Sequence, residues 1–151
     1  MTPCAKRQTM TARTEPRGWR NNNPLNIEYS PRNRWRGQVG SDGRFAIFSS
    51  REYGYRAALK LLRNYQKRYR IMTLTELIGR WCPPSEPGNN TLRYIRMVSE
   101  RGQLSTYEPL DLYYKSEVVR LLEAMTYVEC GLPGDEVAIR GAFEMLRDEG
   151  D

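Results

Sequence analysis

The chain has 151 residues, a formal charge of +6 and no histidine. Without histidine it cannot build a Ser-His-Asp triad, a Cys-His dyad or an H-E-x-x-H zinc site, and it lacks the usual ligands of a zinc amidase. Glycoside hydrolysis needs only Asp and Glu, so that chemistry stays open. The basic pI, near 9.4, indicates an anionic partner such as nucleic acid, a membrane surface or an anionic cell wall.

The first segment, residues 1–17, contains Thr, Arg, Lys and Pro without apolar periodicity, which predicts a disordered arm. It has no apolar stretch of the roughly 7–15 residues found in a Sec signal peptide. No run in the chain approaches the roughly 20 apolar residues that span a bilayer. We therefore expect a protein made in the cytoplasm without a Sec signal, with a single domain over residues 18–151.

Residues 18–50 have the pattern of turns and short strands. Turn signals stand at 21–24 and 40–43, and residues 44–48 alternate like a strand. This part predicts a small antiparallel hairpin or a three-stranded meander.

After Ser50 the apolar period changes from 2 to 3.6, which is typical of helices. The spacing, a capping box at 73–76 and the Asn and Gly stop signals predict helices after Ser50, over 74–81, from Asn89 or Asn90 to about Arg101, over 112–130 and over 135–148. The sequence thus predicts an α+β, mainly α fold, in which a small antiparallel β-lobe is followed by about five helices.

One acidic residue occupies an unusual place in the helix that ends at Cys130. At about 100° per residue, Glu129 falls within the apolar stripe of that helix. The stripe consists of Val118, Leu121, Leu122 and Met125. A carboxyl group that is buried at a helix C-terminus has a raised pKa, as a general acid needs. The alternative is a Glu at a frayed helix end, turned into water or paired with an Arg.

Other acidic residues are weaker candidates for chemistry. Asp42 is the most plausible second carboxylate, and its alternative interpretation is a turn residue. Glu86 lies in a loop rich in Pro and Gly, where we expect it to be exposed. Glu52 begins a helix and is explained by compensation of the helix dipole.

Several motifs resemble a phage and prophage protein family that is usually described as structural or virion protein. The first is Arg17-Gly18-Trp19-Arg20-Asn21-Asn22-Asn23-Pro24-Leu25-Asn26-Ile27, which is similar to an R-G-x-R-N-N-N-P-x-N-I opening. The likeness continues through Trp35–Gly37, Asp42–Phe48, Tyr53–Ala57, Trp81–Glu86, Asn90-Thr91 and Tyr94-Ile95, and it covers about residues 17–131. The family's Glu-x-Gly ending is matched by Glu129-Cys130-Gly131, with Val128 where relatives often have His, and Pro87-Gly88 is inserted after Glu86.

The family also resembles a lysozyme-like or lytic transglycosylase domain with a rearranged order. In lysozyme-like enzymes the helix that ends in the catalytic Glu precedes the β-lobe, whereas here it follows, so we interpret the chain as a circular permutation. The resemblance implies cleavage of peptidoglycan glycan strands by a muramidase or lytic transglycosylase, with Glu129 as general acid and base, Asp42 as a second acid, and no cofactor or metal. It implies a glycan groove lined by Asn22, Asn26, Glu86, Asn90 and Tyr94, although Asn22 and Asn26 equally suit turn stabilisation.

Two further hypotheses remain open from the sequence. The protein could be a non-catalytic phage structural or wall-binding protein, since fold does not fix function. It could bind nucleic acid through the basic helix at 56–70. This is the weakest of the three hypotheses, because the sequence contains no recognisable nucleic-acid-binding motif. The burial of Glu129 distinguishes the enzyme from the non-catalytic protein. A catalytic Glu129 should face an open cleft, whereas a Glu129 that has lost its catalytic role should be covered by side chains. We expect the protein to act at the cell wall or in the virion, with peptidoglycan and other virion proteins as partners.

Overall fold

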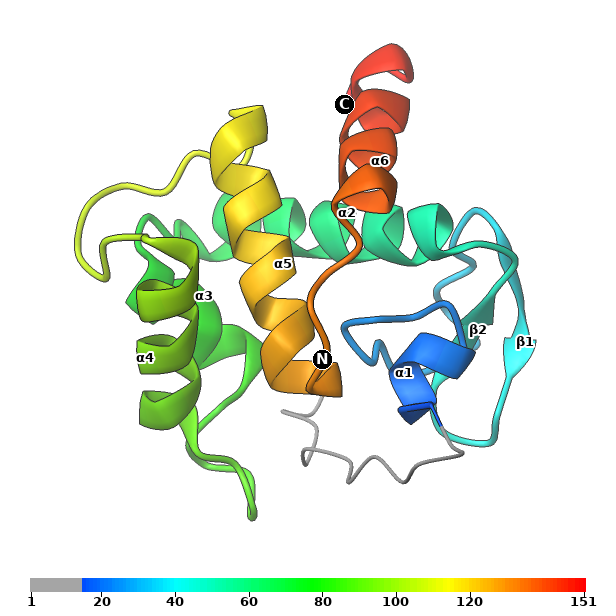
Figure 1. Cartoon of the computed structure of the whole chain (residues 1–151), viewed down its shortest axis with the longest axis horizontal. Coiled ribbons are helices and arrows are strands. Elements are labelled where there is room, and N and C mark those ends of the chain that lie inside the picture. The colour runs from blue at the N-terminus through cyan, green and yellow to red at the C-terminus, as the bar shows by residue number, and fades with distance from the viewer. Residues whose placement is uncertain (1–14) are drawn as a thin grey trace.

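The computed structural model describes residues 15–151, so most of the predicted arm lies outside the described residues. The elements are α1 (Arg17–Arg20), β1 (Gln38–Ser41), β2 (Ala46–Phe48), α2 (Arg51–Tyr69), α3 (Leu74–Trp81), α4 (Thr91–Gly102), α5 (Lys115–Cys130) and α6 (Glu136–Asp148) (Figure 1). The predicted α+β, mainly α fold is confirmed. The short α1 was not predicted, and it begins at the last residue of the predicted arm.

The ends of the helices follow the sequence signals. Thr73 and Glu76 form the reciprocal capping box that opens α3. The side chain of Asn90 accepts the Arg93 N–H at the start of α4, and Gly131 ends α5 in the left-handed conformation, at φ 71°. The predicted caps of these helices are therefore confirmed.

Helix α5 starts three residues later than the predicted Leu112. The backbone N–H of Asp111 donates to the Glu117 carboxylate at 2.6 Å, and the Asp111 carboxylate accepts the Tyr113 N–H at 2.8 Å. These side chains hold residues 111–114 as a turn ahead of the helix. Leu112 is buried although it lies outside the helix, which is why it fitted the apolar pattern.

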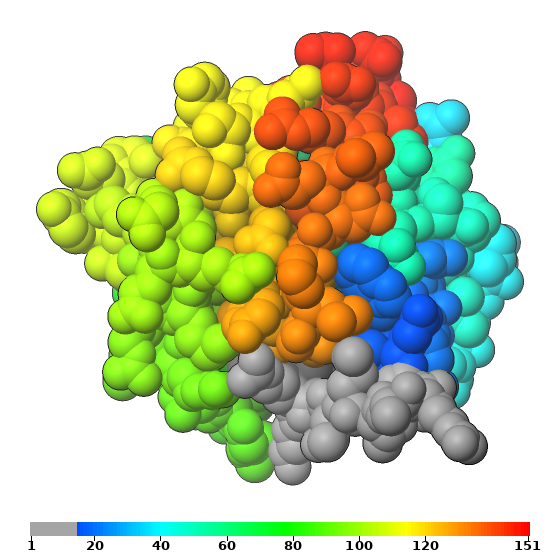
Figure 2. All heavy atoms as spheres, viewed as in Figure 1, coloured from blue at the N-terminus to red at the C-terminus, as the bar shows by residue number. Residues whose placement is uncertain are grey.

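Helix α2 crosses the whole molecule and supports the other helices. In Figure 1 it runs horizontally behind α5 and the base of α6, and it contacts α3, α5 and, most extensively, α6. Helix α5 lies between α4 and α6, and these three fill much of the face in Figure 2. Burial of the facing Leu, Ile and Val side chains is the main stabilising term. Among residues 15–151, no helix is long and apolar enough to cross a membrane.

The β-lobe consists of one antiparallel hairpin and the segment that precedes it. Strands β1 and β2 pair with a register shift, and the turn between them is closed by the Asp42 N–H donating to the Phe45 carbonyl. Before the hairpin, Glu28 forms an isolated bridge with Phe45, in place of a full third strand. The buried Asn23 amide donates to the Ala46 carbonyl at 2.9 Å, which attaches this segment to β2.

Gly54 allows α2 to approach the segment at 21–24. A Cβ atom at this position would overlap the backbone carbonyl of Asn22. Only glycine permits this spacing between the first turns of α2 and the Asn-rich turn. The Tyr53-Gly54-Tyr55 motif therefore fixes how the β-lobe segment sits on the helical part.

Candidate functional site

Glu129 is buried at the C-terminal end of α5, with 1% of its surface exposed. Its Oε2 accepts hydrogen bonds from the Tyr94 hydroxyl at 2.8 Å and from the Trp81 indole N–H at 3.2 Å. Its Oε1 accepts the Asn26 amide at 3.1 Å. The prediction that Glu129 faces the interior is confirmed. We call Asn26, Trp81, Tyr94 and Glu129 the Glu129 cluster.

Each member of the cluster comes from a different part of the chain. Trp81 is the last residue of α3, just before Pro83 and Pro84 prevent the helix from continuing. Tyr94 lies one turn into α4, and Asn26 lies in the segment before the hairpin. Asn26 has the left-handed φ of 53°, which a non-glycine residue adopts rarely and Asn more readily than most. The cluster therefore joins the β-lobe segment to three helices.

The cluster holds a carboxyl group with neutral donors. Burial, and then the neighbouring Glu129, raise the pKa of Tyr94 well above its ordinary value, so its hydroxyl keeps its proton and donates it. The same two causes raise the pKa of the Cys130 thiol to about 12. Removing any one donor would leave the buried carboxyl group with one hydrogen bond fewer, which is costly in a dry interior.

A second layer of tight contacts supports Asn26. A Cβ atom at Gly18 would lie 2.6 Å from the Asn26 Oδ1 and 3.1 Å from the Cys130 sulfur, so only glycine fits there. The Cys130 thiol donates to the Pro24 carbonyl at 3.2 Å. Among the described residues, the buried Asn26 Oδ1 has no hydrogen-bond donor. The Asn26 amide is thus oriented by its contact with Glu129 and by the space that Gly18 leaves.

Asp42, the predicted second acid, belongs to a separate ion-pair network. Arg17 binds its carboxylate with two hydrogen bonds, at 2.6 and 2.9 Å, and Asn21 donates to it at 2.8 Å. The backbone N–H groups of Arg44 and Phe45 also donate to it. The hydrogen bond from Arg17, above all, holds the pKa of Asp42 well below its ordinary value. The structure therefore shows the turn interactions of Asp42, and its catalytic role stays a prediction.

The predicted groove residues divide into two groups. Asn26 and Tyr94 contact Glu129, as described above. The other three interact with nearby backbone: the Asn22 amide donates to the Phe48 carbonyl at 3.2 Å, Asn90 caps α4, and the backbone of Glu86 closes turns in the loop before α4. These are the interactions of turn and cap residues, and glycan binding by them stays a prediction.

From the sequence, Trp81 is the last residue of the predicted helix over 74–81, and nothing there predicts its contact with Glu129. Periodicity predicts which face a residue lies on but not where its indole N–H points. The Trp81–Glu86 motif, which resembles the phage family, is the one signal in the sequence that marks this residue.

The basic face of α2 is not the continuous exposed stripe that nucleic-acid binding would use. The Arg56 guanidinium is buried and pairs with Glu149, and Arg63 is buried and donates to the Leu112 carbonyl at 2.9 and 3.1 Å. Tyr65, one of the two aromatic residues between the cations, is buried as well. Within residues 15–151, no group of three or more His, Cys, Asp and Glu is arranged to hold a metal ion.

The comparisons with known proteins show a homologue from a phage. No family model matches the sequence. The chain is 36% identical over 99 residues to Protein P5 of Pseudoalteromonas phage PM2. The match covers 63% of this chain and 61% of Protein P5, so the chain covers less than two thirds of that relative. The predicted association with phage is supported by this homologue, whose name indicates no activity.

Proposed function

We propose that this phage-related chain cleaves the glycan strands of peptidoglycan, with Glu129 as general acid and base. The observation that supports this best is the Glu129 cluster, in which residues from three other segments of the chain donate hydrogen bonds to one buried carboxyl group. A carboxyl group with a specific set of hydrogen-bond partners is a candidate functional group, because such surroundings adjust its proton affinity. A site that works with carboxylate chemistry alone also suits a chain without histidine.

In the proposed reaction the protonated Glu129 donates its proton to the glycosidic oxygen as the bond to C1 breaks. The electron pair of that bond stays on the leaving oxygen, and positive charge develops at C1 and the ring oxygen. A hydroxyl group then attacks C1, and its proton passes to the Glu129 carboxylate, which restores the starting state. Atoms and charge balance whether the hydroxyl comes from water or from the sugar itself.

The contacts of Asp42 favour the route in which the sugar's own hydroxyl attacks. Five hydrogen bonds, from Arg17, Asn21 and two backbone N–H groups, hold the Asp42 carboxylate in the hairpin turn and in its ion pair, so we assign it no role as nucleophile or base. With Glu129 as the one carboxyl group assigned to the reaction, a lytic transglycosylase needs no second carboxylate, whereas a hydrolase does. The expected product carries a 1,6-anhydro sugar.

The burial of Glu129 favours a second candidate function, a non-catalytic phage structural or wall-binding protein. With 1% of its surface exposed, Glu129 is covered, and a substrate reaches it only if the covering segments separate. In this second function the cluster only stabilises the fold by joining the β-lobe segment to α3, α4 and α5. The two candidates differ in whether Glu129 takes part in chemistry.

The deciding experiment is muropeptide release from purified peptidoglycan, followed by mass spectrometry. The variants are wild type, Glu129→Gln, and the matched control Glu144→Gln, which alters an exposed carboxylate on α6. Release by wild type and Glu144→Gln but not by a folded Glu129→Gln supports the proposal, and folding is checked by circular dichroism. No release by wild type from several peptidoglycan types contradicts it and favours the second candidate. Equal release by all three proteins removes Glu129 from the mechanism.

A further inference from the structure

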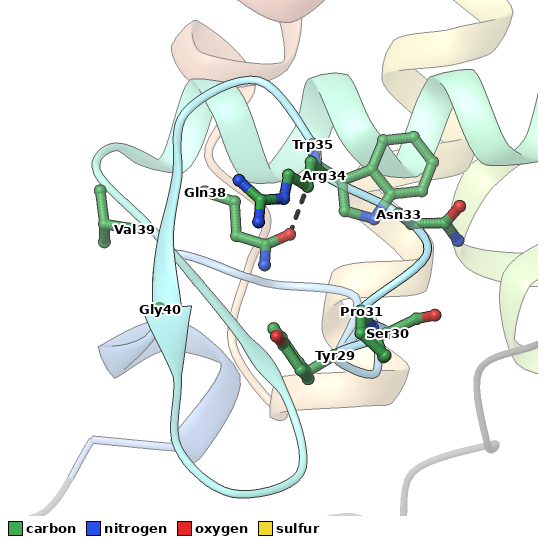
Figure 3. A pocket seen from close by; sticks show the side chains of 9 residues that line it. All are labelled: Tyr29, Ser30, Pro31, Asn33, Arg34, Trp35, Gln38, Val39 and Gly40. Atoms are coloured by element: carbon green, nitrogen blue, oxygen red, sulfur yellow. Dashed lines mark hydrogen bonds between the residues drawn. The ribbon is translucent and has the colours of Figure 1, made fainter.

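The loop between Ile27 and β1 forms a surface cavity of about 290 Å³ that is separate from the Glu129 cluster. Tyr29 lies across the cavity from Arg34 and Gln38, as Figure 3 shows. Ser30 and Asn33 add a hydroxyl and an amide to the lining. The volume is at the lower end of the roughly 300–1,000 Å³ of ligand pockets, so it suits one ring-sized group.

One side chain in the lining of the cavity, Arg34, is a cation. Within the described chain, the guanidinium of Arg34 has no carboxylate partner, and the same holds for Arg32 two residues earlier. Glu28, the nearest acidic residue in sequence, pairs with Arg44 instead, at 3.5 Å. Arg34 is therefore available to bind an anionic group, and a guanidinium binds a carboxylate with two parallel hydrogen bonds.

A second cavity, also of about 290 Å³, adjoins the first and is more basic. The two share Asn33, Arg34 and Trp35 in their linings. Arg32 and Arg36 line the second cavity, and the Arg36 side chain is 58% exposed although it pairs with Glu149. Positive charge thus continues beyond the ring-sized cavity, as the binding of a longer anionic chain requires.

From these observations we propose that the loop at 29–40 is a binding site for an acidic saccharide. The sugar ring stacks on Tyr29, its carboxylate binds Arg34, and its hydroxyl or amide groups bond to Gln38 and Ser30. The Gln38 Oε1 accepts the Trp35 N–H at 3.5 Å, which leaves its amide N–H groups to face the ligand (Figure 3).

The lining favours a saccharide over a nucleic acid. Single-stranded nucleic acids are bound by several exposed rings on which successive bases stack. Here Tyr29 is 46% exposed, whereas Trp35 is packed against the core, so the cavity presents one free ring among amide and hydroxyl groups. Amides and hydroxyls match sugar hydroxyls, and one ring matches one sugar face.

The site lies close in sequence to the Glu129 cluster. Tyr29 follows Asn26 by three residues, which span at most about 11 Å when fully extended. The identification of the ligand as an acidic cell-wall sugar rests on the proposed function. The binding site itself does not depend on catalysis by Glu129. Loss of binding and loss of cleavage can therefore be observed separately.

The test is isothermal titration calorimetry on the full chain with the disaccharide of N-acetylglucosamine and N-acetylmuramic acid, whose lactyl carboxylate is free. It is repeated with neutral chitobiose and with an oligothymidylate. The proteins are wild type, Arg34→Gln, Tyr29→Ala, and the control Arg93→Gln, an exposed residue of α4 without an ion-pair partner in the described chain.

We expect wild type and Arg93→Gln to bind the acidic disaccharide alike, and Arg34→Gln and Tyr29→Ala to bind it at least about tenfold more weakly, which corresponds to about 1.4 kcal/mol. Chitobiose should bind the wild type as weakly as the acidic disaccharide binds Arg34→Gln. Unchanged affinity in Arg34→Gln and Tyr29→Ala, or no binding of the disaccharide at all, overturns the proposal. Tighter, Arg34-dependent binding of the oligothymidylate overturns it in favour of nucleic acid. If these two variants lose binding while peptidoglycan release is absent, the saccharide site stands and the proposed enzyme falls.

Discussion

The Tyr94 hydroxyl donates a hydrogen bond to the Glu129 carboxylate at 2.8 Å, and both residues are almost completely buried. This contact joins the first turns of α4 to the last turn of α5. Because burial and Glu129 both raise the pKa of Tyr94 well above its ordinary value, the hydroxyl keeps its proton at neutral pH and donates it to the carboxyl group.

Tyr94→Phe should lower the free energy of unfolding by about 1–3 kcal/mol, because it leaves a buried acceptor with one donor fewer. Urea unfolding at pH 7, followed by circular dichroism, measures the change. The control is Tyr114→Phe, which removes the hydroxyl of a residue that is 58% exposed and should change stability by less than about 0.5 kcal/mol. Equal stability of both variants would mean that the hydroxyl does not support Glu129.

Asp42→Asn should make the free energy of unfolding depend less on pH in the acid range. The pKa of Asp42 in the folded protein is well below the value of about 3.9 for an unfolded chain, so the unfolded state binds more protons in this range. The contribution of the ionised Asp42 to the free energy of unfolding is therefore fully present above about pH 5, and it is lost progressively as the pH falls below about 4. Solvent screens this pair, so we expect about 0.5–1 kcal/mol.

The measurement compares urea unfolding of wild type and Asp42→Asn at pH 7 and pH 3. The difference between the two proteins should be present at pH 7 and smaller at pH 3. Arg17→Gln should reproduce most of this behaviour, since Arg17 is the main partner. A difference that grows on acidification would contradict the assigned direction.

Gly18→Ala and Gly79→Ala should change stability in opposite directions. At Gly18 a Cβ atom would lie 2.6 Å from the Asn26 side chain and 2.8 Å from the Asn23 carbonyl, so we expect a loss of about 1–3 kcal/mol. At Gly79, inside α3, a Cβ atom would meet nothing within 4 Å. Alanine has the higher helix propensity, so this variant should gain about 0.5–1 kcal/mol. Thermal unfolding of both variants tests the prediction, and equal shifts would refute it.

Glu149→Gln should destabilise the protein more than Glu144→Gln. Glu149 pairs through two hydrogen bonds with Arg56, whose side chain is 7% exposed, so its loss leaves a buried guanidinium partly unpaired. We expect a loss of about 1–3 kcal/mol. Glu144 pairs with Lys115 near the surface and should contribute at most about 1 kcal/mol. Denaturant midpoints of the two variants provide the comparison, and similar values would show that Arg56 finds other partners.

Local signals in the sequence were enough to predict the fold class and most helix ends. The capping box at Thr73 and the left-handed Gly131 depend on neighbouring residues, which is why spacing alone located them. Glu129 could be predicted as buried for the same reason, since its place in an apolar stripe is a property of one helix.

The partners of Glu129 could not be predicted, because they are set by tertiary contacts. Asn26 and Trp81 are 103 and 48 residues away from Glu129 in the chain, and no local pattern relates them to it. The nucleic-acid hypothesis needs the cations of the basic helix at 56–70 to be exposed, as Arg usually is, but Arg56 and Arg63 are buried. Each is buried because a specific acceptor, Glu149 or the Leu112 carbonyl, lies opposite it.

The separation between Asn26 and Glu129 also has a consequence for how the protein folds. During synthesis Asn26 is made 103 residues before the Glu129 carboxyl group that it binds. A contact that closes about 100 residues of chain loses more entropy than a local one and forms more slowly. We expect the N-terminal segment to be the first part of the described chain to be synthesised and among the last to become resistant to proteases.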